Sequence, residues 1–109
     1  MVKKLRLTLP ENPRFLALLK KKIGQYRERM AKMEKNQSPV RTFSTLTGYK
    51  AIIAQRLTLR GEVDTAELSN ELREEYGFVD YAAFNSAAGV IEDYCKTGGK
   101  HVTQEPIRN

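Results

Sequence analysis

The feature that most constrains the fold is a run of apolar residues separated by alternating steps of three and four. Six residues follow this spacing: Leu16, Leu19, Ile23, Tyr26, Met30 and Met33. An α-helix turns once every 3.6 residues, so this spacing places all six on one face of a single long helix. Asn12 is a suitable N-cap and Pro13 suits the first helical position, so we expect the helix to begin there.

This apolar face has two alternative partners. Its spacing is that of a heptad seam, which would join the helix to a second copy of the chain. The same spacing is equally typical of a helix that packs on the core of its own domain. The sequence therefore predicts that the six residues are buried together, against a second copy or against the C-terminal helices. We expect a homodimer.

The segment before the long helix is expected to be a strand. Between positions 4 and 9, leucine alternates with polar residues. Successive side chains of a strand point to opposite faces, so the leucines would face the core and Lys4, Arg6 and Thr8 the solvent. Pro10 would end the strand because it has no N–H to donate to a neighbouring strand.

A loop and three shorter helices are expected to follow the long helix. Residues 38–48 are rich in turn-forming residues, although residues 40–44 could form a short strand. Apolar spacing, N-cap residues and terminating glycines then predict helices over 47–59, 64–76 and 80–97. Another short strand could form at residues 101–103.

These elements predict a mainly α-helical protein with one domain over residues 1–109, a length that suits a single core. The domain would combine a basic strand and long helix (1–37), a compact three-helix head (47–98) and a C-terminal tail (99–109). The chain has a single cysteine, so no internal disulfide can form.

Charge is divided unevenly along the chain. Residues 1–60 contain fifteen Lys and Arg but three acids, a net charge of +12, whereas residues 61–109 contain four bases and ten acids, a net charge of −6. A basic segment of this density attracts polyanions such as nucleic acid, and an acidic segment repels them. The alternative is that the two halves neutralise each other on folding and leave an ordinary solvated surface.

The candidate nucleic-acid contacts lie on the N-terminal strand and the long helix. Three consecutive lysines at 20–22 fan around the helix instead of forming one ridge. Such a broad positive surface favours contacts to phosphates, which position a protein without reading the base sequence. The candidate residues are Lys4, Arg6, Thr8, Lys20, Lys21, Lys22 and Arg27.

No combination of residues indicates an enzyme, a metal site or a cofactor site. His101 is the only histidine and Cys95 the only cysteine, and metal-ligand spacings are absent. Cys95 lies on the inner face of an expected helix, which favours a buried structural thiol. We therefore expect no catalytic residues, no metal and no cofactor.

The sequence also predicts a cytoplasmic protein with no membrane partner. No apolar run approaches the ~20 residues that a membrane-spanning helix needs. The basic N-terminus is not followed by the apolar segment of a secretory signal.

Residues 3–10, Lys-Lys-Leu-Arg-Leu-Thr-Leu-Pro, are followed by an expected helix and resemble the start of ribbon-helix-helix repressors. In that family two such strands pair across a dimer, and their polar faces enter the major groove. The resemblance implies that Lys4, Arg6 and Thr8 face the bases and that the intervening leucines face the core.

Residues 47–103 are similar in layout to a three-helix helix-turn-helix domain with a rudimentary wing. Residues 65–72 stand where such domains place their second helix, which implies that residues 80–96 form the recognition helix. This helix carries three acids and one base, Lys96. Phosphates repel acidic surfaces, so we expect polyanion binding to map to the N-terminal half instead.

The sequence as a whole predicts a small, non-enzymatic nucleic-acid-binding protein, with DNA favoured, that contacts phosphates through its basic N-terminal half. The acidic head could bind a protein partner. The alternative is a protein-interaction module, such as an adaptor or inhibitor of the kind that phages and plasmids encode. In that case the basic half would dock on an acidic partner, or the acidic head would mimic nucleic acid.

Overall fold

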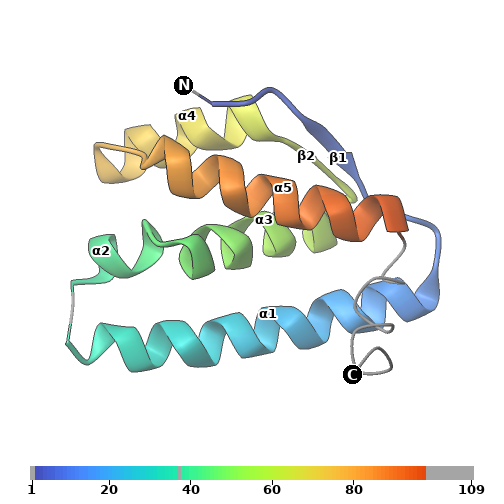
Figure 1. Ribbon diagram of the computed structural model, residues 1–109, viewed down its shortest axis with the longest axis horizontal. Coiled ribbons are helices and arrows are strands. Elements are labelled where there is room, and N and C mark those ends of the chain that lie inside the picture. The colour runs from blue at the N-terminus through green and yellow to red at the C-terminus, as the bar shows by residue number, and fades with distance from the viewer. Residues whose placement is uncertain (1, 37, 98–109) are drawn as a thin grey trace.

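Five helices and a short antiparallel pair of strands make up the computed structural model, which describes residues 2–36 and 38–97 (Figure 1). The expectation of a mainly α-helical fold with an N-terminal strand is confirmed. In chain order the elements are β1 (Arg6–Thr8), α1 (Pro13–Glu34), α2 (Pro39–Phe43), α3 (Leu46–Arg60), β2 (Glu62–Asp64), α4 (Thr65–Tyr76) and α5 (Tyr81–Thr97).

Helix α1 is the single long helix that the apolar spacing predicts. The Asn12 side chain accepts a hydrogen bond from the Arg14 N–H at 3.0 Å, and Pro13 occupies the first turn. The helix continues without a break past Gly24, because that glycine is exposed and the apolar face stays in phase across it. Its buried residues are Phe15, Leu19, Ile23 and Tyr26.

Helix α3 is the central element of the fold. It lies between α1 and α5 in Figure 1 and packs against both. Because it has neighbours on two sides, Ile53, Ala54 and Leu57 are fully buried. The helix ends at Gly61, whose φ of 78° is in the left-handed region that glycine adopts without strain.

Residues 40–44 do not form the short strand that their composition allows. Pro39–Phe43 form the helix α2 instead, and the Ser38 side chain accepts a hydrogen bond from the Arg41 N–H at 3.3 Å. A Ser N-cap followed by Pro favours a helical turn, and no strand of the described chain lies alongside to pair with this segment. The turn inserts Phe43 into the core.

An aromatic cluster joins α2, α3, α4 and α5. The fully buried Tyr49 ring meets the rings of Phe43 and Phe84 edge to face, with centroids 5.4 and 5.3 Å apart. The Phe43 ring also stacks on the Tyr76 ring at a centroid distance of 3.9 Å. The Tyr49 hydroxyl oxygen accepts a hydrogen bond from the Asp80 N–H at 2.9 Å, so this cluster also holds the turn before α5.

Strand β1 pairs with β2 of the same chain, with Leu7 opposite Val63. The expected alternation is confirmed: Leu7 is buried, whereas Lys4, Arg6 and Thr8 are exposed. The strand is shorter than residues 4–9, and β2 is not among the elements that the sequence predicts. A buried Thr65 hydroxyl accepts a hydrogen bond from the Leu5 N–H at 2.8 Å and fixes β1 over the start of α4.

The expected boundaries of the last two helices are confirmed. The Asp64 carboxylate accepts hydrogen bonds from the N–H groups of Ala66 and Glu67. The Asp80 carboxylate accepts one from Ala83 at 3.2 Å. Gly77 ends α4 with a φ of 88°. The tail at 99–109 and the further strand expected at 101–103 lie outside the described residues.

Candidate nucleic-acid interface

Folding neutralises only part of the basic half of the chain. Within the described residues there are three ion pairs, and two of them join the basic half to the acidic half: Arg6 with Glu62 at 3.1 Å and Arg56 with Glu71 at 2.9 Å. The third, Lys96 with Glu92 at 3.9 Å, lies within α5. The interpretation that the two halves neutralise each other therefore applies to Arg6 and Arg56.

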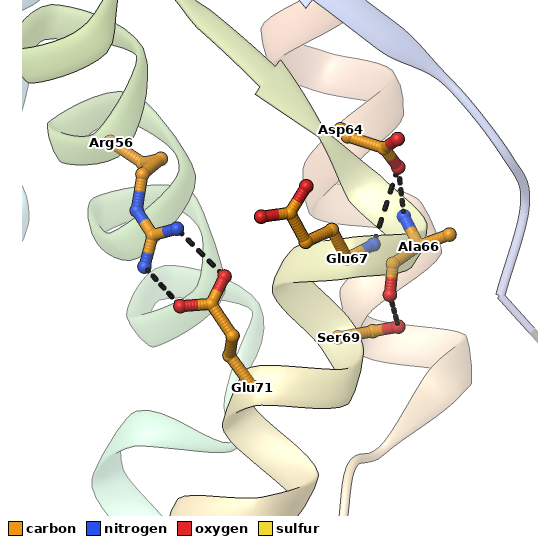
Figure 2. A network of polar contacts seen from close by, with 6 residues as sticks. All are labelled: Arg56, Asp64, Ala66, Glu67, Ser69 and Glu71. Carbon is orange, nitrogen blue, oxygen red and sulfur yellow. Dashed lines mark hydrogen bonds and ion pairs between the residues drawn. The ribbon is translucent and has the colours of Figure 1, made fainter.

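The Arg56–Glu71 pair has two hydrogen bonds, one from each terminal nitrogen of the guanidinium, at 2.9 and 3.2 Å (Figure 2). These bonds from Arg56 hold the pKa of the Glu71 carboxyl below its ordinary value, and Arg60 lowers that pKa further. A guanidinium occupied in this way is not available to a phosphate.

A polar hollow of about 340 Å³ lies next to this pair. Its charged lining consists of three arginines and three carboxylates: Arg6, Arg56, Arg60, Glu62, Asp64 and Glu67. The opposite charges balance, and Asp64 is already occupied as the N-cap of α4 (Figure 2). This hollow consequently has no net attraction for an anion.

The bases of helix α1 differ from Arg6 and Arg56 in that they form no such ion pairs among the described residues. The helix carries seven bases and two acids, a net charge of +5. Six of these bases are exposed and Lys22 is half-buried. None of them forms an ion pair with any residue in the part of the chain that the structure describes. In Figure 1, α1 and the acidic α4 lie on opposite sides of α3, and no ion pair among the described residues joins α4 to α1.

Three cations gather where α1 packs against α3. Lys22, Tyr26 and Arg29 follow one another on α1 at steps of four and three, so they share one side of the helix. From α3, the Lys50 ammonium lies 6.0 Å from the centroid of the Tyr26 ring. Burial lowers the pKa of Lys50, and the charges of Arg29 and Lys22 lower it further. We call Lys22, Arg29 and Lys50 the cation cluster.

The Tyr26 phenol at the base of the cluster is neutral at physiological pH. Burial, with a further contribution from Tyr94 of α5, raises its pKa to about 12, although Arg29 acts in the opposite direction. The phenol therefore supplies no negative charge to offset the three cations. Its ring is an uncharged surface beneath the Lys50 ammonium.

The other predicted contact residues lie around this cluster or away from it. Lys20, Lys21 and Arg27 are exposed on α1. Lys4, which precedes β1, and Thr8 of β1 are exposed, and Arg6 of β1 is exposed but paired with Glu62.

Of the predicted contacts, Lys22 alone belongs to the cation cluster, and sequence reasoning missed both Arg29 and Lys50. Arg29 could have been found, because it stands seven residues, about two helical turns, after Lys22. No sequence signal links Lys50 to α1, since the link depends on how α3 packs.

The six apolar residues expected to be buried together on α1 are divided by the structure. Leu19, Ile23 and Tyr26 are buried within the chain itself, and no second copy is needed to cover them. Leu16, Met30 and Met33 are half-buried. Phe15 joins the buried face, which is therefore set by contact with α3 as well as by the heptad spacing.

The N-terminal segment lies along the helix expected to be the recognition helix. The Lys3 N–H donates a hydrogen bond to the Asn85 side-chain oxygen of α5 at 2.8 Å.

Further along α5, Cys95 is half-buried, and burial raises the pKa of its thiol to about 11. At neutral pH this thiol is protonated and a weak nucleophile.

No helix within the described ranges is both long and apolar enough to span a membrane. Over the same ranges, no group of three or more His, Cys, Asp and Glu side chains is placed to hold a metal ion. His101 lies outside the described residues.

Comparison with known proteins finds no family model that matches the chain, and no curated protein or solved structure matches it significantly.

Proposed function

We propose that the protein binds nucleic acid, with DNA favoured, through the cationic surface of α1, and that it does so without catalysing a reaction. The observation that carries this proposal is the unequal pairing of the cations. Arg6 and Arg56 meet carboxylates of the acidic half, whereas the seven bases of α1 meet none among the described residues. Charge that served only to balance the acidic half would lie within reach of it.

The length of α1 supports a duplex as the ligand. At 1.5 Å per residue, its 22 residues extend over about 33 Å. One turn of duplex DNA is of similar length, about 34 Å. Lysines and arginines distributed along such a helix contact several phosphates, and each contact releases counterions. Binding of this kind is independent of base sequence and weakens steeply as salt rises.

The acidic part of the molecule orients the protein on such a ligand. Helix α4 carries four acids and one base, and it lies on the far side of α3 from α1 (Figure 1). A polyanion therefore attracts one side of the molecule and repels the other.

The test is a salt titration of duplex binding, measured by fluorescence anisotropy with a random-sequence duplex. The variant Lys20→Gln/Lys21→Gln removes two exposed charges from α1. We expect it to weaken binding to all sequences alike and to reduce the salt slope by about 0.9 for each phosphate that the variant no longer neutralises.

The matched control removes two exposed charges elsewhere, as Arg73→Gln/Lys96→Gln, and is expected to have little effect. If both double variants lose the same affinity, the interface is not on α1. If the wild-type protein binds no duplex or single strand at low salt, the proposal is wrong.

A second candidate function, a protein-interaction module, has its support in exposed apolar side chains. Leu59 on α3 is 79% exposed, and Phe78 in the turn before α5 is 45% exposed. Exposed apolar side chains of this size mark a protein interface when they form one contiguous patch. This candidate replaces the first if the wild-type protein binds no nucleic acid.

A further inference from the structure

We propose that the cation cluster of Lys22, Arg29 and Lys50 is a discrete site for phosphate groups of nucleic acid, with the Tyr26 ring as its floor. The inference rests on the proposed function and deepens it. It assigns to three residues from two helices a larger share of the binding free energy than three other bases of α1 contribute.

The two-helix construction distinguishes this cluster from the other bases of α1. Lys20, Lys21 and Lys32 project into solvent from one helix. In the cluster, Lys50 approaches from α3 and its ammonium lies 6.0 Å from the centroid of the Tyr26 ring. The packing of α1 on α3 therefore brings the Lys50 ammonium to the side of α1 that carries Lys22 and Arg29.

The cluster is electrostatically unsatisfied without an anion. Three positive charges lie together, and none of them forms an ion pair within the described ranges. Burial lowers the pKa of Lys50, and the positive charges of Arg29 and Lys22 lower it further. A phosphate placed among the three side chains would attract all of them and so offset the repulsion between them. Because Lys22 and Lys50 are half-buried, solvent screens their attraction to a phosphate less than it does for fully exposed lysines.

The chemistry of the three side chains suits phosphate oxygens. A guanidinium such as that of Arg29 donates two parallel N–H bonds to one phosphate group. The two ammonium groups supply charge and further donors, and the aromatic face beneath Lys50 favours its charged form. Lys22 and Arg29 are seven residues apart, about 10.5 Å along the helix, a span that accepts one phosphate or two successive ones.

The experiment compares two triple variants that each remove three positive charges from α1 and its surroundings. The first, Lys22→Gln/Arg29→Gln/Lys50→Gln, replaces all three charged side chains of the cation cluster by neutral ones. We expect it to bind a short random duplex at least about tenfold more weakly than the control variant does at the same low salt. Circular dichroism melting establishes that both variants are folded.

The control variant, Lys20→Gln/Lys21→Gln/Lys32→Gln, removes the same charge from exposed positions of the same helix. Equal reductions of affinity in the two variants would overturn the discrete site and leave the proposed function intact. If neither variant weakens binding, or the wild-type protein does not bind, both the discrete site and the proposed function are wrong.

Two further measurements separate a phosphate site from a structural role. The charge-conserving variant Lys22→Arg/Lys50→Arg should retain most of the affinity that the glutamine variant loses. In NMR titrations of the lysine side chains, added duplex should raise the pKa of Lys50, and an unchanged pKa would contradict the site. Duplexes with and without 5′-phosphates distinguish the two sources: a terminal-phosphate site loses affinity with the unphosphorylated duplex, and a site for internal phosphates does not.

Discussion

The guanidinium of Arg56 and the carboxylate of Glu71 join α3 to α4 through two hydrogen bonds, at 2.9 and 3.2 Å (Figure 2). Both side chains are partly accessible to solvent, with exposed fractions of 23% and 42%. A pair of this kind stabilises a fold by up to about 1 kcal/mol. The pair also neutralises Arg56, a cation of the basic half. The positive charge that is left to attract a polyanion is therefore concentrated on α1.

The loss of stability on removal of this pair should depend on pH in a defined direction. Arg56 holds the pKa of Glu71 below its ordinary value of 4.5. The stabilisation by the pair is therefore complete above pH 4.5 and is lost as the pH falls through the lowered pKa. Urea unfolding should show Glu71→Gln to be less stable than wild type near neutral pH, by up to about 1 kcal/mol, with the difference vanishing in acid.

The control for this experiment is Glu74→Gln on the same helix, because Glu74 is exposed and forms no ion pair within the described residues. Its effect on the free energy of unfolding should be smaller at neutral pH. A deficit of Glu71→Gln that persisted unchanged into acid would show that the ion pair is not its cause.

Two glycines should respond in opposite directions to replacement by alanine. At Gly48, a Cβ would collide with the backbone carbonyl of Phe43, because α2 and α3 approach each other there without room for a side chain. Gly48→Ala should cost about 1–3 kcal/mol of the free energy of unfolding. At Gly24 a Cβ would meet nothing within 4 Å. Gly24→Ala should stabilise the protein by about 0.5–1 kcal/mol, because alanine is the better helix former.

Both glycine variants can be compared by thermal melting under one set of conditions. Gly48→Ala should lower the melting temperature and Gly24→Ala should raise it. An unchanged melting temperature for Gly48→Ala would mean that α2 does not pack on the start of α3 as described. A lower melting temperature for Gly24→Ala would mean that α1 is interrupted at this position.

Ile23→Asp should destabilise the chain by several kcal/mol, because it would place an unpaired charge against α3. Ile23 is 8% exposed within a single chain, so the destabilisation should be independent of protein concentration. Leu59→Asp, at a position 79% exposed, should leave the melting temperature nearly unchanged. Melting and light scattering together check this prediction. A variant at Ile23 that changed the oligomeric mass but not the melting temperature would place this face in a dimer interface.

Local sequence signals determined most helix boundaries of this protein. Asn12, Asp64 and Asp80 cap their helices with side-chain oxygens, and Gly61 and Gly77 end theirs in the left-handed conformation. Capping involves residues at most a few positions apart, so a sequence carries the information directly. The same holds for the alternation that buries Leu7 and exposes its neighbours in β1.

Tertiary packing decided what no local pattern contained. Residues 40–44 have strand-forming side chains, but no strand of the described chain lies alongside to pair with them, and as a helix they place Phe43 among the core rings. The pairing of β1 with β2 joins segments more than fifty residues apart, as the register Arg6 opposite Asp64 shows. Pairings over such separations depend on the whole fold.

The candidate site was also determined partly by the sequence and partly by the tertiary structure. The sequence by itself determined that positive charge is concentrated in the first sixty residues, because charge is a property of each side chain. Only the tertiary structure decided which of those charges are neutralised. It brought Arg56 to Glu71 and placed Lys50 beside Tyr26, because attraction and repulsion between charges depend on distance in space and on burial.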